Sequence, residues 1–294
     1  MRRYLPKTKI MILAVSLSLW SFSGHSARHI PLPSHNNFQK CLDIFPNRIV
    51  PTSISKTIID MCKFASHKAI FAVRFDTTRK TPNWAVHKLI AQDIQNFAKR
   101  KRPRFFQDKS LEAKHQALDA SYTHSGFSRG HIVPAYDMSW NRDAYKATFN
   151  LTNVVPQKQA FNAGPWLGME NAFRDLVRRK NTTIWDISGV YGEIKDKPVI
   201  GASPHAPTAP KCFYKIFIAK ERGVPRFKVL AALFTWNDFG KRKTWHNSLT
   251  TLDQIQNRTG INFLQNIPVE NSFDAQYWGV SAPQKPADCR SGML

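Results

Sequence analysis

The sequence predicts an α+β fold. Runs of apolar, β-branched and aromatic residues bounded by turn residues indicate strands, while two longer segments have the pattern of helices. The two kinds of element do not follow the regular strand–helix–strand order of a parallel, doubly wound sheet. A length of 294 residues and a hydrophobic content of 42% are typical of a globular protein with a sizeable core.

The first expected element is a hairpin. Residues 69–76 (AIFAVRFD) alternate apolar and polar positions as a half-buried strand does, TTRKTP is a turn, and residues 83–90 (NWAVHKLI) form the returning strand. Later β-prone runs predict three more strands, at residues 183–192, 212–220 and 227–236.

Two helices are expected, at residues 164–180 and 250–260. The second has a threonine cap at its start and a glycine at its end, as helix termini prefer. Together the elements predict one domain over residues 66–270. An N-terminal arm rich in Pro, Asn and Ser precedes it over residues 27–65, and a C-terminal tail follows it over residues 271–294.

The chain is strongly basic, with a formal net charge of +23. The run AKRKRPRF at residues 98–105 is an especially dense cationic stretch. Such an excess of charge predicts a polyanionic partner. The charge alone leaves this partner open among nucleic acid, an acidic membrane surface and an acidic glycan.

Residues 1–26 have the order of a secretory signal peptide. Basic MRRYLPKTK precedes apolar IMILAVSLSLWSF, which is short for a membrane span, and the small residues of SGHSA follow. We therefore expect cleavage, a secreted or periplasmic location and no stable membrane association afterwards. An uncleaved anchor is the alternative, and a mitochondrial presequence fits the continuous apolar run less well. Removal takes away four basic residues and no acidic one, which leaves a charge of +19.

The four cysteines are Cys41, Cys62, Cys212 and Cys289, and none of them lies in a CxxC motif. An even count in an exported chain suggests two disulfides. Of the three pairings, we favour Cys41–Cys62 with Cys212–Cys289, because each bond ties a peripheral segment down; the second would tether the C-terminal tail. Buried free thiols are the alternative.

One segment combines residue types that suit phosphodiester cleavage. Arg129 and His131 lie within FSRGHIVPAYDM, and a neutral imidazole is a suitable base near pH 7. Asn162, Glu170 and Arg174 follow at steps of eight and four residues, which keeps them on one broad helical face. Guanidinium groups suit phosphate oxygens. On spacing alone, a structural role, such as an ordinary turn into a strand, is the more common explanation of a histidine near an arginine.

Longer blocks resemble a known family. SGFSRGHIVPAYDM, TFNLTNVVPQKQAFNAGPW and the following ME resemble the signature of the DNA/RNA non-specific endonucleases, the Serratia-type secreted nucleases. VRFDTTRKTPNWAVHKL, IWDISGVYG, CFYKIFI and IQNRTGINFLQNIP resemble further family segments, in family order over about residues 70–268. The resemblance implies the His-Me finger (ββα-metal) fold, with a mixed, largely antiparallel sheet flanked by helices. It also implies a secreted, Mg²⁺-dependent enzyme that cuts DNA and RNA.

The resemblance assigns the central chemistry to three residues. His131 resembles the general base that deprotonates the attacking water. Asn162 resembles the single protein ligand of Mg²⁺, for which Mn²⁺ is a substitute. Glu170 resembles the carboxylate that hydrogen-bonds the water shell of the metal, and one protein ligand plus waters is a common way to hold Mg²⁺.

The remaining roles implied by the resemblance concern the substrate. Arg174 resembles an arginine that contacts phosphate, and Arg129 would bind or orient phosphate within the core motif. Asn153 resembles the asparagine that supports the histidine and the substrate. A further phosphate-binding arginine corresponds to either Arg102 or Arg104 in RPRFFQD.

One departure from the family pattern is Ser128, which stands where an aspartate is usual. This acid is neither the base nor the metal ligand in the pattern. The rival hypotheses are a catalytically impaired relative that binds nucleic acid or another polyanion, and an enzyme restricted to DNA or to RNA.

Overall fold

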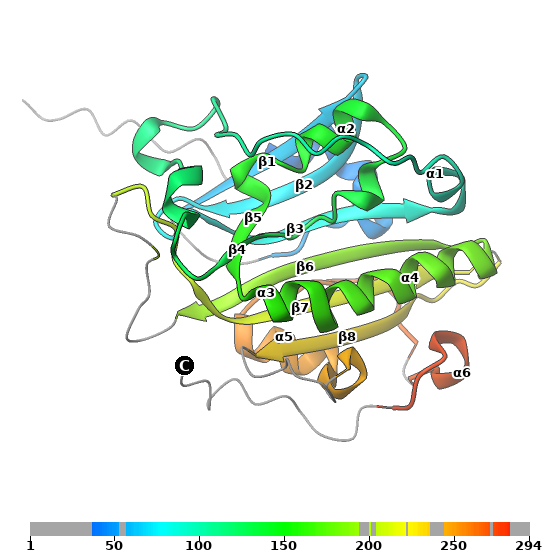
Figure 1. Cartoon of the computed structure of the whole chain (residues 1–294). Coiled ribbons are helices and arrows are strands. Elements are labelled where there is room, and N and C mark those ends of the chain that lie inside the picture. The colour runs from blue at the N-terminus through cyan, green and yellow to red at the C-terminus, as the bar shows by residue number, and fades with distance from the viewer. Residues whose placement is uncertain are drawn as a thin grey trace, which may run out of the picture. The chain divides into compact units, whose positions relative to one another are not determined.

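A computed structural model of the chain confirms the predicted α+β fold (Figure 1). Seven antiparallel strands form the main sheet in the order β1-β2-β3-β6-β7-β8-β9, and β4 pairs with β5 in a separate two-stranded sheet. The structure describes residues 37–52, 57–193, 200, 204–221, 223–235, 244–270 and 273–282.

The strands are β1 (Ile58–Ala65), β2 (Lys68–Asp76), β3 (Thr81–Ile90), β4 (Ser128–His131), β5 (Val154–Gln157), β6 (Thr183–Glu193), β7 (Pro210–Lys220), β8 (Lys228–Thr235) and β9 (Leu249–Thr250). The α-helices are α1 (Ala91–Gln95), α2 (Arg142–Ala147), α3 (Gln159–Phe161), α4 (Leu167–Lys180), α5 (Leu252–Thr259) and α6 (Ala275–Trp278). None of the described helices is long and apolar enough to cross a membrane.

Most predicted elements are confirmed, and their local chemistry explains why. The hairpin is β2–β3, and the three later strands are β6, β7 and β8. Helix α5 begins where the side chain of Thr251 accepts a hydrogen bond from the amide of Gln254, and it ends at Gly260 with φ +68°. A left-handed residue at this position costs least when it is glycine.

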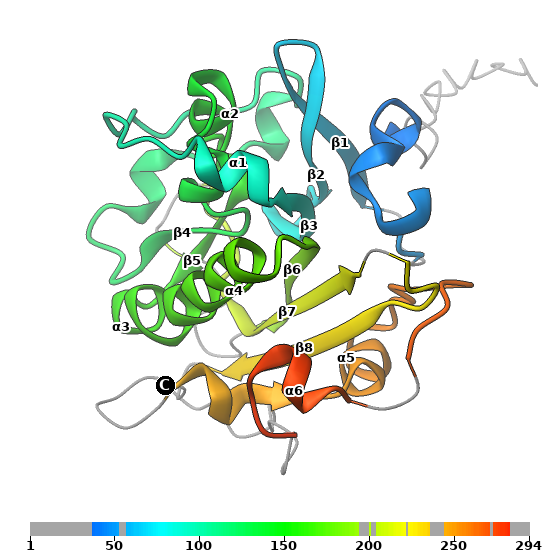
Figure 2. The same cartoon turned by 90° about the vertical axis from the view of Figure 1, so that its right-hand side faces the viewer.

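The prediction that residues 69–76 form a half-buried strand was wrong. Every residue of β2 from Ile70 to Asp76 is buried, because both faces of the sheet are covered. Figure 2 shows α3 and α4 on one face, and α5 with the N-terminal 3₁₀ helix η1 (Asn37–Ile44) on the other. Large apolar side chains fill the space on both faces. Phe173 of α4 stacks on Phe217 of β7 on one face, and Trp84 of β3 stacks on Phe38 of η1 on the other.

The N-terminal arm expected over residues 27–65 contains part of the sheet. Residues 58–65 form the edge strand β1, whose Ile58 pairs with Asp76 of β2. The burial of β1 does not alternate regularly, so its sequence carried little strand periodicity. The predicted disulfide between Cys41 and Cys62 is confirmed and joins η1 to β1. The predicted Cys212–Cys289 bond involves Cys289, which lies outside the described residues.

The C-terminal tail expected over residues 271–294 includes helix α6. Trp278 of α6 packs edge-on against Phe173 of α4, with 5.7 Å between ring centroids. The ammonium group of Lys228 joins the tail to β8 through hydrogen bonds to Glu270 and Asp274 at 2.7–3.0 Å.

Candidate active site

His131 ends β4 and pairs with Val154, the first residue of β5. Its imidazole lies between two aromatic rings, with centroids 5.3 Å from Phe105 and 4.8 Å from Phe149. The Nε2 atom is buried and has no hydrogen-bond partner among the described residues. Buried polar atoms are normally paired, which makes this nitrogen unusual. The residue as a whole is partly exposed, so the exposed part of the ring is a candidate for contact with substrate or water.

The surroundings of the ring favour its neutral form. Burial, followed by the positive charge of Arg102, lowers the pKa of His131 from its ordinary 6.5 to about 3. The unfolded chain therefore binds a proton near pH 6.5 that the folded chain accepts only near pH 3. Folding stability must fall as the pH is lowered through this interval.

We expect His131→Phe, which suits an aromatic pocket, to reduce this pH dependence. Between pH 7 and pH 4.5, the wild-type protein should lose more unfolding free energy than the variant, because only the wild type has this low-pKa imidazole. Urea denaturation at both pH values measures the two losses. Equal losses would contradict the assignment of a buried, neutral imidazole.

The glycine of the core motif is explained by a close approach between β4 and β5. A Cβ atom on Gly130 would lie only 2.1 Å from Oε1 of Gln157, so no other residue fits here without displacing that side chain. Gln157 is fully buried, and its Oε1 and Nε2 have no partner among the described residues. Next to it, the hydroxyl of Ser128 donates to Oε1 of Gln159 at 2.5 Å, which ties β4 to α3.

Asn153 positions the strand that carries His131. Its side-chain oxygen accepts from the amide of Val133 at 2.9 Å, and its amide group donates to the carbonyls of Val133 and Thr148, both at 3.0 Å. The backbone carbonyl of Asn153 also accepts from the amide of Ile132. Asn153 is 0% exposed, so its contacts in this structure are with the backbone, and its predicted support of the substrate stays a prediction.

Two of the predicted arginines lie at the imidazole. Cζ of Arg102 is 5.4 Å from the centroid of Phe105, the ring that packs against the imidazole, and Cζ of Arg129 is 5.8 Å from the same centroid. Arg129 is held by Asp119, through an ion pair and a 2.8 Å hydrogen bond to the carbonyl. Arg104 is exposed and makes no such contact among the described residues, so the geometry favours Arg102 over Arg104.

Asn162 lies at a break in the helical path. The segment Asn162–Trp166 is a single π-helical turn between α3 and α4, in which Gly164 leaves helical geometry (φ −102°, ψ −113°) and Pro165 supplies no amide. Such turns are frequent at functional sites. The side chain of Asn162 is partly exposed and makes no hydrogen bond to any described residue. Its amide oxygen is therefore free to bind a cation.

Glu170 lies about two helical turns after Asn162. A basic side chain contacts each of its two carboxylate oxygens, one from the same helix and one from the sheet. Nη2 of Arg174 donates to Oε2 at 3.3 Å, and Nζ of Lys215 on β7 is 3.7 Å from Oε1. Burial raises the pKa of Glu170 above its ordinary range, against the opposing charges of Lys215 and Arg174. The two cations therefore favour the carboxylate form in a site where burial disfavours it.

Arg174 is a buried residue that contacts three neighbouring side chains, and its predicted contact with phosphate stays a prediction. It is 4% exposed, and its three guanidinium nitrogens bind Asp137, Asn171 and Glu170. Asp137 in turn lies 2.9 Å from Nε2 of His87 on β3. Although burial opposes its ionised form, Arg174 and His87 lower the pKa of Asp137 to about 2.

The same network continues into the main sheet. Lys215 is 0% exposed, and its ammonium donates to Asp186 at 3.2 Å and to Ser188 at 3.0 Å, both on β6. It also lies 4.0 Å from the ring of Trp166. Three buried carboxylates, those of Asp137, Glu170 and Asp186, thus face the buried charges of Arg174 and Lys215.

The sequence analysis did not identify Gln157, His87, Asp137 and Lys215 as part of this site. Asp137 follows His131 by six residues, and His87 and Lys215 occupy polar positions within otherwise apolar strands. A charged or titratable residue inside an apolar strand could have identified His87 and Lys215, because such a residue needs a buried partner.

The donor set fits a hydrated divalent cation. Among the described residues, no group of three or more His, Cys, Asp or Glu side chains could hold a metal ion. Asn162 offers one free amide oxygen, and Glu170 offers a carboxylate that is paired with Arg174. A hard cation that keeps most of its waters requires no more protein ligands than this.

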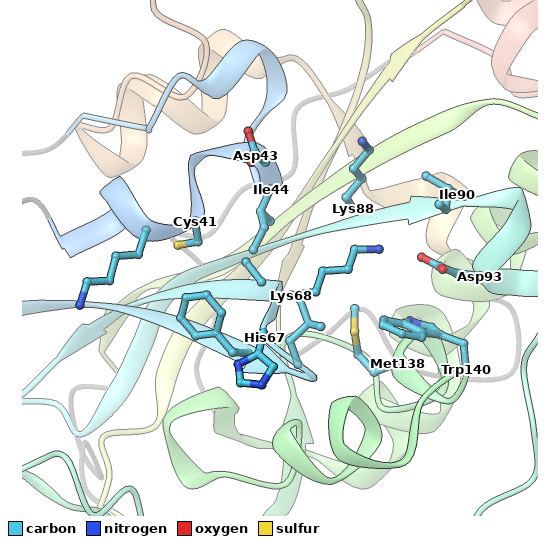
Figure 3. Close-up of a pocket in the computed structure, with 14 residues that line it drawn as sticks. Cys41, Asp43, Ile44, His67, Lys68, Lys88, Ile90, Asp93, Met138 and Trp140 are labelled. Carbon is cyan, nitrogen blue, oxygen red and sulfur yellow. The ribbon is translucent and has the colours of Figure 1, made fainter.

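A cavity of about 360 Å³ lies apart from these residues, where β2 begins and β3 ends (Figure 3). Figure 3 shows Lys68 extending toward Asp93, and its Nζ is 5.4 Å from the ring centroid of Trp140. Asp43 and Lys88 also line the cavity. Because acidic and basic groups are mixed along its wall, it lacks the uniform positive charge that a phosphate site requires.

Comparisons with known proteins agree with this geometry. Residues 55–270 match the family described as DNA/RNA non-specific endonuclease. The chain is 33% identical to mitochondrial nuclease EXOG of Xenopus laevis over 161 residues, which cover 52% of this chain and 44% of that protein. It is 26% identical to a nuclease of Nostoc over 224 residues, which cover 74% of this chain and 79% of that protein.

The match thus spans less than half of the frog relative and about four-fifths of the cyanobacterial one. The fold is similar to that of a chain in the crystal structure of the EndoG/EndoGI complex, with a TM-score of 0.59 at 21% identity. The alignment covers 70% of this chain and 86% of that chain. This likeness confirms the expected His-Me finger fold. The chain belongs to the DNA/RNA non-specific endonuclease family.

Proposed function

We propose that the protein is an endonuclease that uses Mg²⁺, with Mn²⁺ as a substitute, to hydrolyse phosphodiester bonds of DNA and RNA without sequence preference. The observation that carries the proposal is the imidazole of His131, which is partly exposed and lies between aromatic rings beside two guanidinium groups. The net charge of +23 suits a polyanionic substrate that is bound through its backbone.

In this proposal, the imidazole of His131 accepts a proton from the attacking water. The negative charge of a bound phosphodiester raises the imidazole pKa from its low value toward neutrality, where a general base is most effective. Arg102 and Arg129 stabilise the negative charge that develops on the phosphate oxygens. A divalent cation held by Asn162 would supply Lewis-acid stabilisation of the same charge and of the leaving oxygen.

The buried network supports this chemistry by positioning. Glu170 would accept hydrogen bonds from the waters of the cation, and Arg174 and Lys215 orient its carboxylate. Asp137 links this network to the loop that follows His131, through its contact with Arg174. The base and the metal-side carboxylate are thereby held on one rigid framework.

We propose export from the cytoplasm, to the periplasm or the medium, on the basis of residues 1–26. These residues lie outside the part of the chain that the structure describes. The EXOG and endonuclease G relatives are, by their names, mitochondrial proteins. Sequencing the N-terminus of the protein recovered from its native host distinguishes cleavage near residue 26 from retention of the segment.

Asn162→Ala tests the function and the cation site together. We expect the wild-type protein to nick plasmid DNA and to degrade RNA with Mg²⁺ and to stop in EDTA. The variant should be slowed by more than about tenfold, because loss of even a supporting group costs about 10- to 100-fold at metal sites. Isothermal titration of Mg²⁺ into each protein measures the loss of affinity independently of cleavage.

The matched control is Asn257→Ala, which removes an exposed asparagine from α5 and should cut normally. Cleavage that persists in EDTA, or an unaffected Asn162→Ala, would contradict the proposal. DNA binding without any cleavage by the wild type would instead favour the impaired, polyanion-binding relative. In that case Ser128→Asp, which restores the acid usual in the family, is the first variant to make.

A further inference from the structure

Tyr136 is an unusual surface residue close to the candidate active site. It is 50% exposed, and the other large hydrophobic side chains that the described residues expose, Phe64 and Leu167, are 44% and 39% exposed. Tyr136 follows His131 by five residues, and the next residue, Asp137, belongs to the buried network. Within this loop, the carboxylate of Asp137 is buried and the aromatic ring of Tyr136 is exposed to solvent.

The ring is held in place by two neighbours. Cζ of Arg174 lies 5.3 Å from its centroid, and the ring of Phe97 meets it edge-on, with 4.9 Å between centroids and 66° between planes. Arg174 is itself fixed by Asp137 and Glu170. Little side-chain entropy is therefore lost when a planar ligand stacks on the exposed part of Tyr136.

A cationic segment connects this ring to the imidazole. Lys99, Lys101 and Arg102 are exposed within residues 98–104, directly after Phe97. Nε of Arg100 donates to the carbonyl of Ser139 at 2.5 Å, which fixes the segment to the Tyr136 loop. At its other end, Arg102 lies over the aromatic rings that enclose the imidazole. A polyanionic strand can follow this segment from the tyrosine to the imidazole.

The spacing along α4 suits neighbouring nucleotides. Tyr136 stacks on Arg174, one helical turn beyond Glu170, and one turn of four residues advances about 6 Å along a helix. A base next to the scissile phosphate can therefore reach the ring. Bases inside a duplex are covered on both faces by their stacked neighbours, so only an unpaired base presents a face to an aromatic side chain.

We propose that Tyr136 is a stacking platform for an unpaired base beside the cleaved phosphate. This proposal rests on the proposed nuclease function and names its substrate class, which is single-stranded nucleic acid or locally unpaired segments of a duplex. The segment 98–104 supplies the backbone contacts and Tyr136 supplies the base contact. Stacking of this kind tolerates any base, in agreement with an absence of sequence preference.

The test measures binding in the His131→Ala background, where the probes stay intact. The probes are a fluorescent single-stranded 12-nucleotide DNA, the same strand with abasic residues throughout, and a blunt duplex of equal length. Tyr136→Ala should weaken binding of the single strand by about fivefold to 150-fold, the range found when one stacked base loses its aromatic partner. Binding of the abasic strand and the duplex should change less than about twofold.

Three further variants serve as controls. Tyr136→Phe keeps the aromatic face and should bind all probes as the parent does. Tyr136→Leu keeps apolar packing against Phe97 without an aromatic face and should match Tyr136→Ala. Phe64→Ala removes another exposed ring, on β1, and should have no effect.

An equal loss of affinity for the base-containing and abasic strands, or no loss for either, would overturn the platform. So would full binding by Tyr136→Leu. Because binding is measured without cleavage, these outcomes are separate from failure of the nuclease proposal, which appears as absence of metal-dependent cutting by the wild-type protein.

Discussion

Replacing His131 with alanine should slow Mg²⁺-dependent plasmid nicking by about 10²- to 10⁴-fold, the contribution typical of a general base. The substitution removes the unpartnered Nε2 atom and leaves Arg102, Arg129 and the buried network in place. Binding of the substrate should therefore persist while the rate of cleavage falls. Single-turnover cleavage at saturating protein separates the two effects.

The control for this experiment is His246→Ala, because His246 is an exposed histidine outside the candidate site. It should nick plasmid at the wild-type rate. Cleavage that survives in His131→Ala would mean that another group deprotonates the water. A loss of both binding and thermal stability would mean that His131 is chiefly a packing residue between its aromatic neighbours.

Lys215→Met is expected to lower the free energy of unfolding by about 3–5 kcal/mol, the range found when one partner of a buried ion pair is removed. The ammonium of Lys215 contacts Glu170 and Asp186, and all three side chains are buried. Without it, two carboxylates remain in the interior with one fewer neutralising charge. Urea denaturation at pH 7 measures the loss.

Two comparisons test whether the loss arises from charge. Lys146→Met removes an exposed lysine and should change stability by less than about 0.5 kcal/mol. Adding Asp186→Asn to Lys215→Met removes one uncompensated carboxylate and should recover part of the lost stability. If Lys215→Met is as stable as the wild type, the buried contacts are energetically unimportant. If the double variant recovers nothing, the loss comes from packing.

The candidate site was predictable wherever its residues lie in one continuous motif. His131, Asn162 and Glu170 fall within 40 residues that form a hairpin, a π-helical turn and a helix in sequence order. Local chemistry also determined the ends of α5, through Thr251 and Gly260. These features depend on periodicity, caps and turns, which a short stretch of chain encodes by itself.

Other features required the folded chain. The sequence left open whether Arg102 or Arg104 lies at the imidazole, and it assigned Arg174 to phosphate although the folded chain buries this side chain among Asp137, Asn171 and Glu170. It also missed the edge strand β1, whose pairing depends on β2 more than on its own pattern.

The buried network is the clearest case of a property that only tertiary structure decided. His87, Asp137 and Lys215 lie far apart in the chain, and no local pattern brings them together. The role of each charge depends on which partners its burial supplies, because an unpaired charge is costly in the interior and a paired one is tolerated. The sequence alone therefore determined the family, the fold class and the main candidates for the chemistry. Long-range packing decided that Arg102 lies beside the aromatic rings around the imidazole and that Arg174 is buried against Glu170.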